Sequence, residues 1–160
     1  MIDADIRIHD ARWGDGDRDI DALVSTGLRA ALAEVTNAPD AAEVAILFTD
    51  DAMQRQLNRD HRGKDSATNV LSFPAQDTPL PPGIPCPIGD ISLAYETVLR
   101  EAKSGGVSID AHLCHLIIHG FLHLLGYDHE DDAEALIMEQ TETRALARIG
   151  IADPYRPQQV

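Results

Sequence analysis

Residues 112–130 read HLCHLIIHGFLHLLGYDHE, an apolar stretch with histidines at regular intervals. Residues 116–126 are the longest apolar run in the chain, and only His119 and His123 interrupt it. The run is shorter than the roughly 18 residues that a membrane-spanning helix needs. It predicts a buried helix at the centre of a domain. We expect Asp110 to open this helix and Gly126 to end it, because glycine accepts the left-handed backbone that closes helices.

Shorter segments on both sides of this helix predict the other elements of the fold. Apolar residues that alternate or form short runs predict strands within residues 6–8, 44–48, 70–73 and 89–93. Helical spacing predicts helices over residues 20–35 and 131–148, and a third helix that ends near Lys103. A further helix is expected to begin after Thr49 or Asp50, which can cap it, and to bury Met53 and Leu57. Residues 74–87 are rich in proline and predict a loop.

These elements predict an α+β fold in one domain over residues 1–160. We expect a small mixed sheet of about four strands, packed with about five helices, and a metal site at the end of the central helix. The net charge of −14 argues against a general binder of DNA or RNA, so an RNA-binding role needs a local basic patch. The acidic N-terminus is not typical of a signal peptide, and Cys86 and Cys114 suggest no disulfide framework. We therefore expect a cytoplasmic protein without a membrane partner.

Three histidines at the end of the predicted central helix have the spacing of metal ligands. His119 and His123 are four residues apart, so they lie one turn apart on the same face of a helix. After Gly126 the chain turns back, and His129 can supply a third ligand. Three neutral histidines leave a fourth position for water, as in catalytic zinc sites, although imidazole also suits copper, nickel and iron. The alternative is that these histidines only satisfy hydrogen bonds at a helix end.

Neighbouring residues refine this prediction. His115 lies one turn before His119 and can replace it as a ligand, but we expect it to support the ligands, and we expect His112 to be exposed. Asp128 can accept a hydrogen bond from a ligand histidine or cap the turn. Metalloproteases of the HExxH type carry a glutamate where this chain has Gly120, so the motif offers no general base of that kind.

The segment from residue 57 to residue 74 holds the best local concentration of positive charge. Its basic residues Arg59, Arg62 and Lys64 outnumber its acidic residues, Asp60 and Asp65. A guanidinium can bind a phosphate through two hydrogen bonds. The alternative is a solvated helix end, where cations are favourable in any case.

Residues 119–129, HGFLHLLGYDH, resemble the H-G-x-L-H-L-x-G-Y-D-H motif of the YbeY family of bacterial endoribonucleases. A second block of that family is similar to LN at 57–58, RGKD at 62–65 and TNVLSFP at 68–74. GDI at 89–91 and DPY at 153–155 follow in the same order. The resemblance covers about residues 44–155.

This resemblance implies a zinc-dependent endoribonuclease, specific for single-stranded RNA, that acts in 16S rRNA 3′-end maturation and ribosome quality control. By position it implies one Zn²⁺ per chain, held by His119, His123 and His129, and a catalytic role for Arg62. The implied partners are single-stranded RNA or rRNA and ribosomal small-subunit proteins or assembly factors, but not DNA. Residues expected to support the ligands or contact the substrate are Lys64, Ser72, Asp90, His115 and Asp128.

Two alternatives stay open at this point. A ribosome-assembly binding module with a mainly structural zinc would be favoured by a fourth protein ligand that closes the site, for instance His115 or Cys114. A metallopeptidase would need a carboxylate near the metal, for which Asp90 and Glu130 are the nearest candidates along the sequence.

Overall fold

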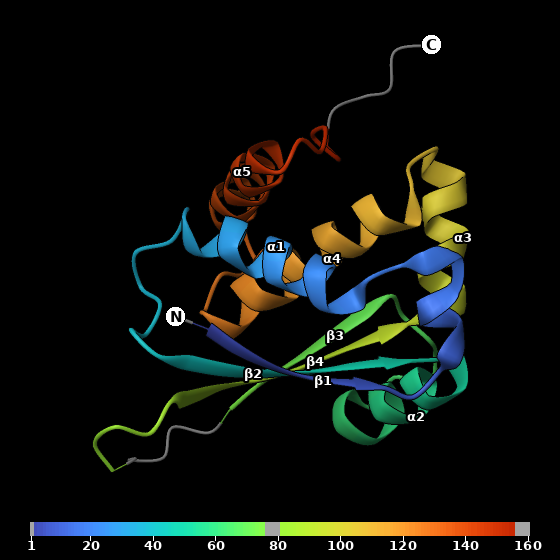
Figure 1. Ribbon diagram of the computed structural model, residues 1–160, viewed down its shortest axis with the longest axis horizontal. Helices are drawn as coiled ribbons and strands as arrows, with labels where there is room; N and C mark the ends of the chain where they lie inside the picture. Colours follow the sequence, from blue (N-terminus) through green and yellow to red (C-terminus); the bar gives the residue numbers. More distant parts are fainter. Residues whose placement is uncertain (1, 76–80, 156–160) are drawn as a thin grey trace.

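Four strands form one mixed sheet in a computed structural model that describes residues 2–75 and 81–155. The strands lie in the order β1-β2-β4-β3 (Figure 1). β1, β2 and β4 are parallel, and β3 pairs with β4 in the antiparallel direction, at the edge of the sheet. Their bounds are β1 Ile2–Ile8, β2 Ala42–Thr49, β3 Val70–Pro74 and β4 Cys86–Ala94. The predicted mixed sheet is confirmed, and the proline-rich loop joins β3 to β4, although its residues 76–80 lie outside the described residues.

The helices cover the two faces of this sheet unequally. α1, α4 and α5 lie on one side of it and α2 lies on the other (Figure 1). A short 3-10 segment, η1, precedes α1. The bounds are η1 Ala11–Asp17, α1 Ile20–Leu32, α2 Asp51–Arg62, α3 Tyr95–Gly105, α4 Ile109–Leu124 and α5 Asp132–Arg148. The predicted α+β class is therefore confirmed.

α4 is the central buried helix that the sequence predicts. Leu113, Ile117 and Phe121 on this helix are fully buried in the core between α1 and the sheet. The helix begins at Ile109, slightly before the predicted start at Asp110, because the hydroxyl of Ser108 accepts the N–H of Ala111 at 3.0 Å and caps it. Burial on all sides explains why this segment is apolar almost all round.

α2 differs from the prediction in the face that it buries. The expected inward residues, Met53 and Leu57, are only half-buried, and the fully buried ones are Gln54 and Asn58. Gln54 Nε2 donates to the carbonyl oxygen of Ser92 at 3.0 Å, and Asn58 Nδ2 donates in the same way to Ser66 at 2.9 Å. These amides are buried because each bonds to backbone that would otherwise lose its partner.

Trp13, in η1, fills the end of the core and was not among the expected core residues. It is fully buried, and its Nε1–H donates to the carbonyl oxygen of Thr49 at 2.9 Å. Its ring meets Phe48 and Tyr95 edge-on, with centroids 5.2 and 5.3 Å away. η1 thus joins the end of β2 to the start of α3.

Among the described residues, no single helix is both long and apolar enough to cross a membrane. α3 and α4 pass that test only when taken together, and they are bent by 115° at their junction.

Candidate metal centre

After α4 ends, the chain turns back toward the last turns of this helix. Gly126 adopts a φ of 100°, and its N–H donates to the carbonyl oxygen of His123 at 3.0 Å. The N–H of Tyr127 donates to Leu122 at 3.0 Å, which completes a Schellman closure of the helix. The predicted stop at Gly126 is confirmed. This turn brings His129 back beside His123.

The side chains of His119, His123 and His129 converge at this point. The Nε2 atoms of His119 and His123 are 3.0 Å apart, and one ring nitrogen from each of the three residues lies within 4.8 Å of the others. His119 and His123 are half-buried, and His129 is exposed, so the group opens to solvent on one side. Three imidazole nitrogens at this separation fit a tetrahedral metal ion with one position left for water.

The protonation of His123 suits a metal ligand. Burial lowers the pKa of this imidazole, and the neighbouring His119 and His129 lower it further. The neutral form, which carries the lone pair that binds a cation, is therefore favoured at neutral pH.

Glu142 on α5 is a residue of this centre that the motif did not reveal. Its carboxylate is completely buried and accepts very short hydrogen bonds from His119 Nδ1 and from the hydroxyl of Tyr155. Burial alone would raise its pKa, but the bonds from His115, His119 and Tyr155 together lower it to about 2. A signal was present in the sequence, because Glu142 shares a helix face with the buried residues Met138 and Ala145.

The two earlier histidines of α4 do not join the three-histidine group. His115 Nε2 lies 3.4 Å from a carboxylate oxygen of Glu142 and 3.4 Å from the hydroxyl of Tyr155, beside the residues that hold His119. The prediction that His112 is exposed is wrong. Its side chain is 16% exposed, and its Nε2 lies 2.9 Å from Glu101, which reaches it from α3.

Cys114 points away from the histidines. Its Sγ lies 3.9 Å from the carbonyl oxygen of Leu23 on α1, in the buried contact between the two helices. Within residues 2–75 and 81–155, neither Cys114 nor His115 belongs to the group whose ligand atoms converge. The group is thus open rather than closed by a fourth protein ligand in that part of the chain.

Asp128 bonds to the backbone of a candidate ligand, not to a ring. Its carboxylate accepts the N–H of His129 at 2.7 Å, so it supports the turn that carries this histidine. It also lies near Glu130 and Glu134, and their carboxylate oxygens are within 4.8 Å of one another.

Ser72 and Gly120 form a contact between the basic segment, residues 57–74, and the histidine motif, residues 119–129. The hydroxyl of Ser72, on β3, donates to the carbonyl oxygen of Gly120 at 3.3 Å. A Cβ at position 120 would lie 3.1 Å from that hydroxyl and 3.3 Å from the side chain of Ile91. Helix α4 therefore packs closely against the sheet here, and the glutamate of an HExxH motif at position 120 would have to displace Ser72 or Ile91.

Arg62 ends α2 and lies along β3. Gly63, with a φ of 70°, closes the helix, and Arg62 Nη2 donates to the carbonyl oxygen of Ser72 at 2.5 Å. Its guanidinium also lies over the ring of Phe73, 5.6 Å from the centroid. The structure thus brings Arg62 to the backbone of Ser72, whose side chain contacts Gly120, and to the ring of Phe73, the next residue along β3.

The charges around Arg62 differ in whether they are paired. Arg59 pairs with Asp60 at 3.4 Å, and Arg55 pairs with Asp65 at 2.7 Å. In the described residues no carboxylate pairs with Arg62 or Lys64, and Lys64 is exposed. These two cations are the ones available to an anionic ligand.

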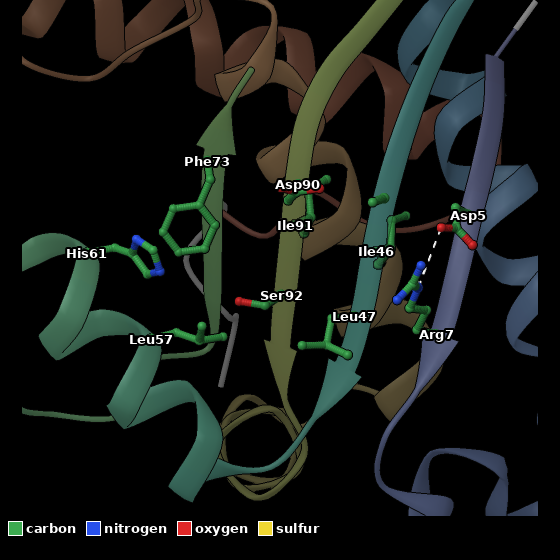
Figure 2. Close-up of a pocket in the computed structure, with 11 residues that line it drawn as sticks. Asp5, Arg7, Ile46, Leu47, Leu57, His61, Phe73, Asp90, Ile91 and Ser92 are labelled. Carbon is green, nitrogen blue, oxygen red and sulfur yellow. Dashed lines mark ion pairs between the residues drawn. The ribbon is translucent and has the colours of Figure 1, made fainter. Parts of the chain in front are cut away.

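Asp90 lies on the other face of the sheet. It is in register with Ala45 on β2 and Phe73 on β3, whereas its neighbour Ile91 faces Gly120. Figure 2 shows Asp90 on this open face, between Phe73 and the Asp5–Arg7 pair, which measures 3.5 Å. The face is hollowed by a pocket of about 530 Å³, with Leu57 and His61 of α2 at one side. The structure does not bring Asp90 to the histidines.

Comparison with known proteins identifies close relatives of this chain. The family described as Endoribonuclease YbeY matches residues 8–150. A protein named Endoribonuclease YbeY from Chelativorans sp. (strain BNC1) is 55% identical over 133 residues, which are 83% of this chain and 81% of the relative. The protein of that name from Rhizobium meliloti (strain 1021) is 47% identical over an alignment 165 positions long, which covers 98% of this chain and 96% of the relative.

A solved structure shares the fold. The solution structure of a protein from Thermotoga maritima aligns with a TM-score of 0.56 at 21% sequence identity. The alignment covers 96% of this chain and 99% of that one. At this identity the likeness concerns the fold alone.

Proposed function

The chain belongs to the YbeY family of endoribonucleases, and from this premise we propose that it is a zinc-dependent endoribonuclease specific for single-stranded RNA. We propose that it acts in the cytoplasm in 16S rRNA 3′-end maturation and ribosome quality control. The observation that carries the zinc assignment is the convergence of His119, His123 and His129 on one point that opens to solvent.

The donor set supports zinc and a catalytic role for it. Three imidazoles with an open fourth position are typical of catalytic zinc sites, and we propose one ion per chain. A bound zinc ion would polarise a phosphoryl oxygen and lower the pKa of a bound water from 15.7 to about 7. The chain's own residues must then place the phosphate and hold the ligands in position.

Arg62 is the residue that we assign to the phosphate. Its guanidinium is unpaired by any carboxylate of the described residues, and it donates to the backbone of Ser72, whose hydroxyl bonds to Gly120. A planar guanidinium can donate two hydrogen bonds to a phosphate whose negative charge grows during cleavage. We assign Lys64 a weaker contact with the RNA backbone.

The charge distribution supports a short, local RNA contact. A net charge of −14 repels a long duplex, whose binding draws on many Lys and Arg contacts. A flexible single strand can place one phosphate at Arg62 while the rest stays in solvent. The same acidic surface suits basic small-subunit proteins or assembly factors as partners.

The peptidase alternative is less well supported. The glutamate of an HExxH motif at position 120 would have to displace Ser72 or Ile91, and Asp90 faces the other side of the sheet. A closed metal site would favour the binding-module alternative, but His115 and Cys114 lie outside the three-histidine group.

An RNA-cleavage assay tests the proposal. The substrates are one oligonucleotide as a single strand and the same oligonucleotide annealed to its complement. We expect cleavage of the single strand, and a loss of about 10²-fold to 10³-fold in kcat/KM for Arg62→Gln. Arg62→Lys should recover little, because a lysine cannot reproduce the two-pronged contact.

Arg55→Gln is the matched control, since Arg55 lies on the same helix but is exposed and paired with Asp65. It should cleave as the wild type does. His123→Ala, purified in the same way, detects a contaminating ribonuclease. Wild-type activity in folded Arg62→Gln and His123→Ala would contradict the proposal.

A further inference from the structure

The carboxylate of Glu142 is completely buried, and three side chains surround it. One of its oxygens bonds to His119 Nδ1, and the other bonds to the hydroxyl of Tyr155 and lies 3.4 Å from His115 Nε2. A buried carboxylate costs several kcal/mol unless hydrogen bonds compensate for the lost water. In the part of the chain that the structure describes, this compensation comes from His119, Tyr155 and His115.

The bond between Glu142 and His119 has a consequence for the other ring nitrogen. One oxygen of Glu142 accepts the hydroxyl of Tyr155, and a carboxylate only accepts hydrogen bonds, so the proton in its bond to His119 sits on Nδ1. A neutral imidazole carries one N–H, so Nε2 of His119 is then left with its lone pair. This Nε2 is the atom that lies 3.0 Å from His123 Nε2, at the centre of the group.

Tyr155 reaches this carboxylate from 13 residues further along the chain. It belongs to the DPY segment that follows α5, and the carboxylate of Asp153 accepts its N–H at 2.8 Å. The Tyr155 hydroxyl can donate to Glu142 because burial and the adjacent carboxylate raise its pKa and keep it protonated. The segment after α5 is thereby tied to Glu142 on α5, and through this carboxylate to His119 on α4.

We propose that Glu142 is a positioning residue that fixes the Nδ1–H tautomer and the ring orientation of His119, and that Tyr155 holds Glu142 in place. The proposal rests on the proposed metal site, but its first test needs neither metal nor RNA. Partners of this kind behind a metal ligand typically contribute a factor of 10 to 100 in metal affinity.

The first measurement is the ¹⁵N NMR spectrum of the histidine side chains in the metal-free protein. We expect His119 as the Nδ1–H tautomer in the wild type, and a mixture that includes the Nε2–H tautomer in Glu142→Gln. An amide keeps the shape of the carboxylate but can donate as well as accept, so it no longer fixes the proton. A wild-type His119 in the Nε2–H form would overturn the proposal.

The second measurement is zinc affinity by competition with a chelator. Glu142→Gln should weaken binding 10-fold to 100-fold, and Tyr155→Phe should weaken it by less than about tenfold, since Glu142 keeps its other partners. Glu139→Gln is the matched control, because it removes a neighbouring negative charge from the same helix without a hydrogen bond to the histidines in the described residues. It should change the affinity less than twofold.

The outcomes separate this proposal from the proposed function. Wild-type zinc affinity in both Glu142→Gln and Tyr155→Phe would overturn the positioning role, whatever the RNA assay shows. If Glu142→Gln fails to fold by circular dichroism, Tyr155→Phe decides, because Tyr155 is 42% exposed and can lose its hydroxyl without opening the core. If the wild type binds no zinc, the metal assignment fails, and the tautomer of His119 still tests Glu142.

Discussion

The hydroxyl of Ser72 donates to the carbonyl oxygen of Gly120 across the contact between β3 and α4, at 3.3 Å. This bond connects the two sequence motifs, since Arg62 donates to the backbone of Ser72 and Gly120 adjoins His119. A glycine is needed because a Cβ at this position would lie 3.1 Å from the Ser72 hydroxyl. Two hydrogen bonds of Ser72 thus link the arginine of the first motif to the helix that carries the histidines.

Gly120→Ala should destabilise the protein. The added methyl group improves helix propensity by about 1 kcal/mol, but overpacking a tight contact costs about 1–3 kcal/mol. We expect a net loss of about 1 kcal/mol, measured by urea unfolding followed by circular dichroism. Gly27→Ala on α1 is the control, since its Cβ would lie 3.6 Å from Ile117, an ordinary contact, and it should stabilise. Equal effects of the two substitutions would refute the tight contact.

The thiol of Cys114 should react slowly. Burial, and to a lesser extent Asp110, raise its pKa from 9.0 to about 11. At pH 8, in a Cys86→Ser background, we expect alkylation at least about 100-fold slower in the folded protein than in urea, as two pKa units imply. The rate should rise with pH until about 11. Equal rates in the folded and unfolded protein would contradict the burial of this thiol.

The same shift gives Cys114 a defined effect on stability. The unfolded thiol releases its proton near pH 9, whereas the folded one retains it until about pH 11. The stability that Cys114 contributes is therefore fully present below pH 9 and falls as the pH rises through that interval.

The sequence predicted the parts of the centre that lie close together in the chain. The i, i+4 spacing of His119 and His123 and the turn at Gly126 are local features, and both are present in the structure. Glu142 was missed because it contacts His119 from another helix, 23 residues away. Spacing along one helix says nothing of such a contact.

The same limit explains the other differences. His112 was expected to be exposed because only its own helix was considered, but Glu101 on α3 covers it. On α2, apolar residues were expected to be buried most deeply, yet Gln54 and Asn58 are, because the strand and loop backbone beside them needs hydrogen-bond partners. Tertiary contacts override a local pattern in both cases.

Trp13→Phe should strongly destabilise the protein, although Trp13 lies outside the sheet and the long helices. It removes the donor to the carbonyl oxygen of Thr49 and leaves a void beside Phe48. An unsatisfied buried acceptor costs about 1–3 kcal/mol, so we expect a loss of about 2–4 kcal/mol with the lost volume included. Urea unfolding followed by circular dichroism measures it. A change below about 0.5 kcal/mol would show that η1 is not part of the core.

Bound zinc should stabilise the protein through the three histidines. A ligand that binds only the folded state adds about 2.7 kcal/mol when its concentration is 100 times Kd. The melting temperature of the wild type should therefore rise with added zinc, and that of His129→Ala should rise much less. An equal rise in both proteins would indicate that zinc binds elsewhere.

The most direct test of the central claim is the zinc content of the purified protein by native mass spectrometry. We predict one zinc ion per chain in the wild type and in His112→Ala. His115→Ala should also retain it, since its ring lies beside Glu142 and outside the group. His119→Ala, His123→Ala and His129→Ala should each lose it. Zinc retained in folded His123→Ala or His129→Ala, or lost in His115→Ala, would contradict the three-histidine centre.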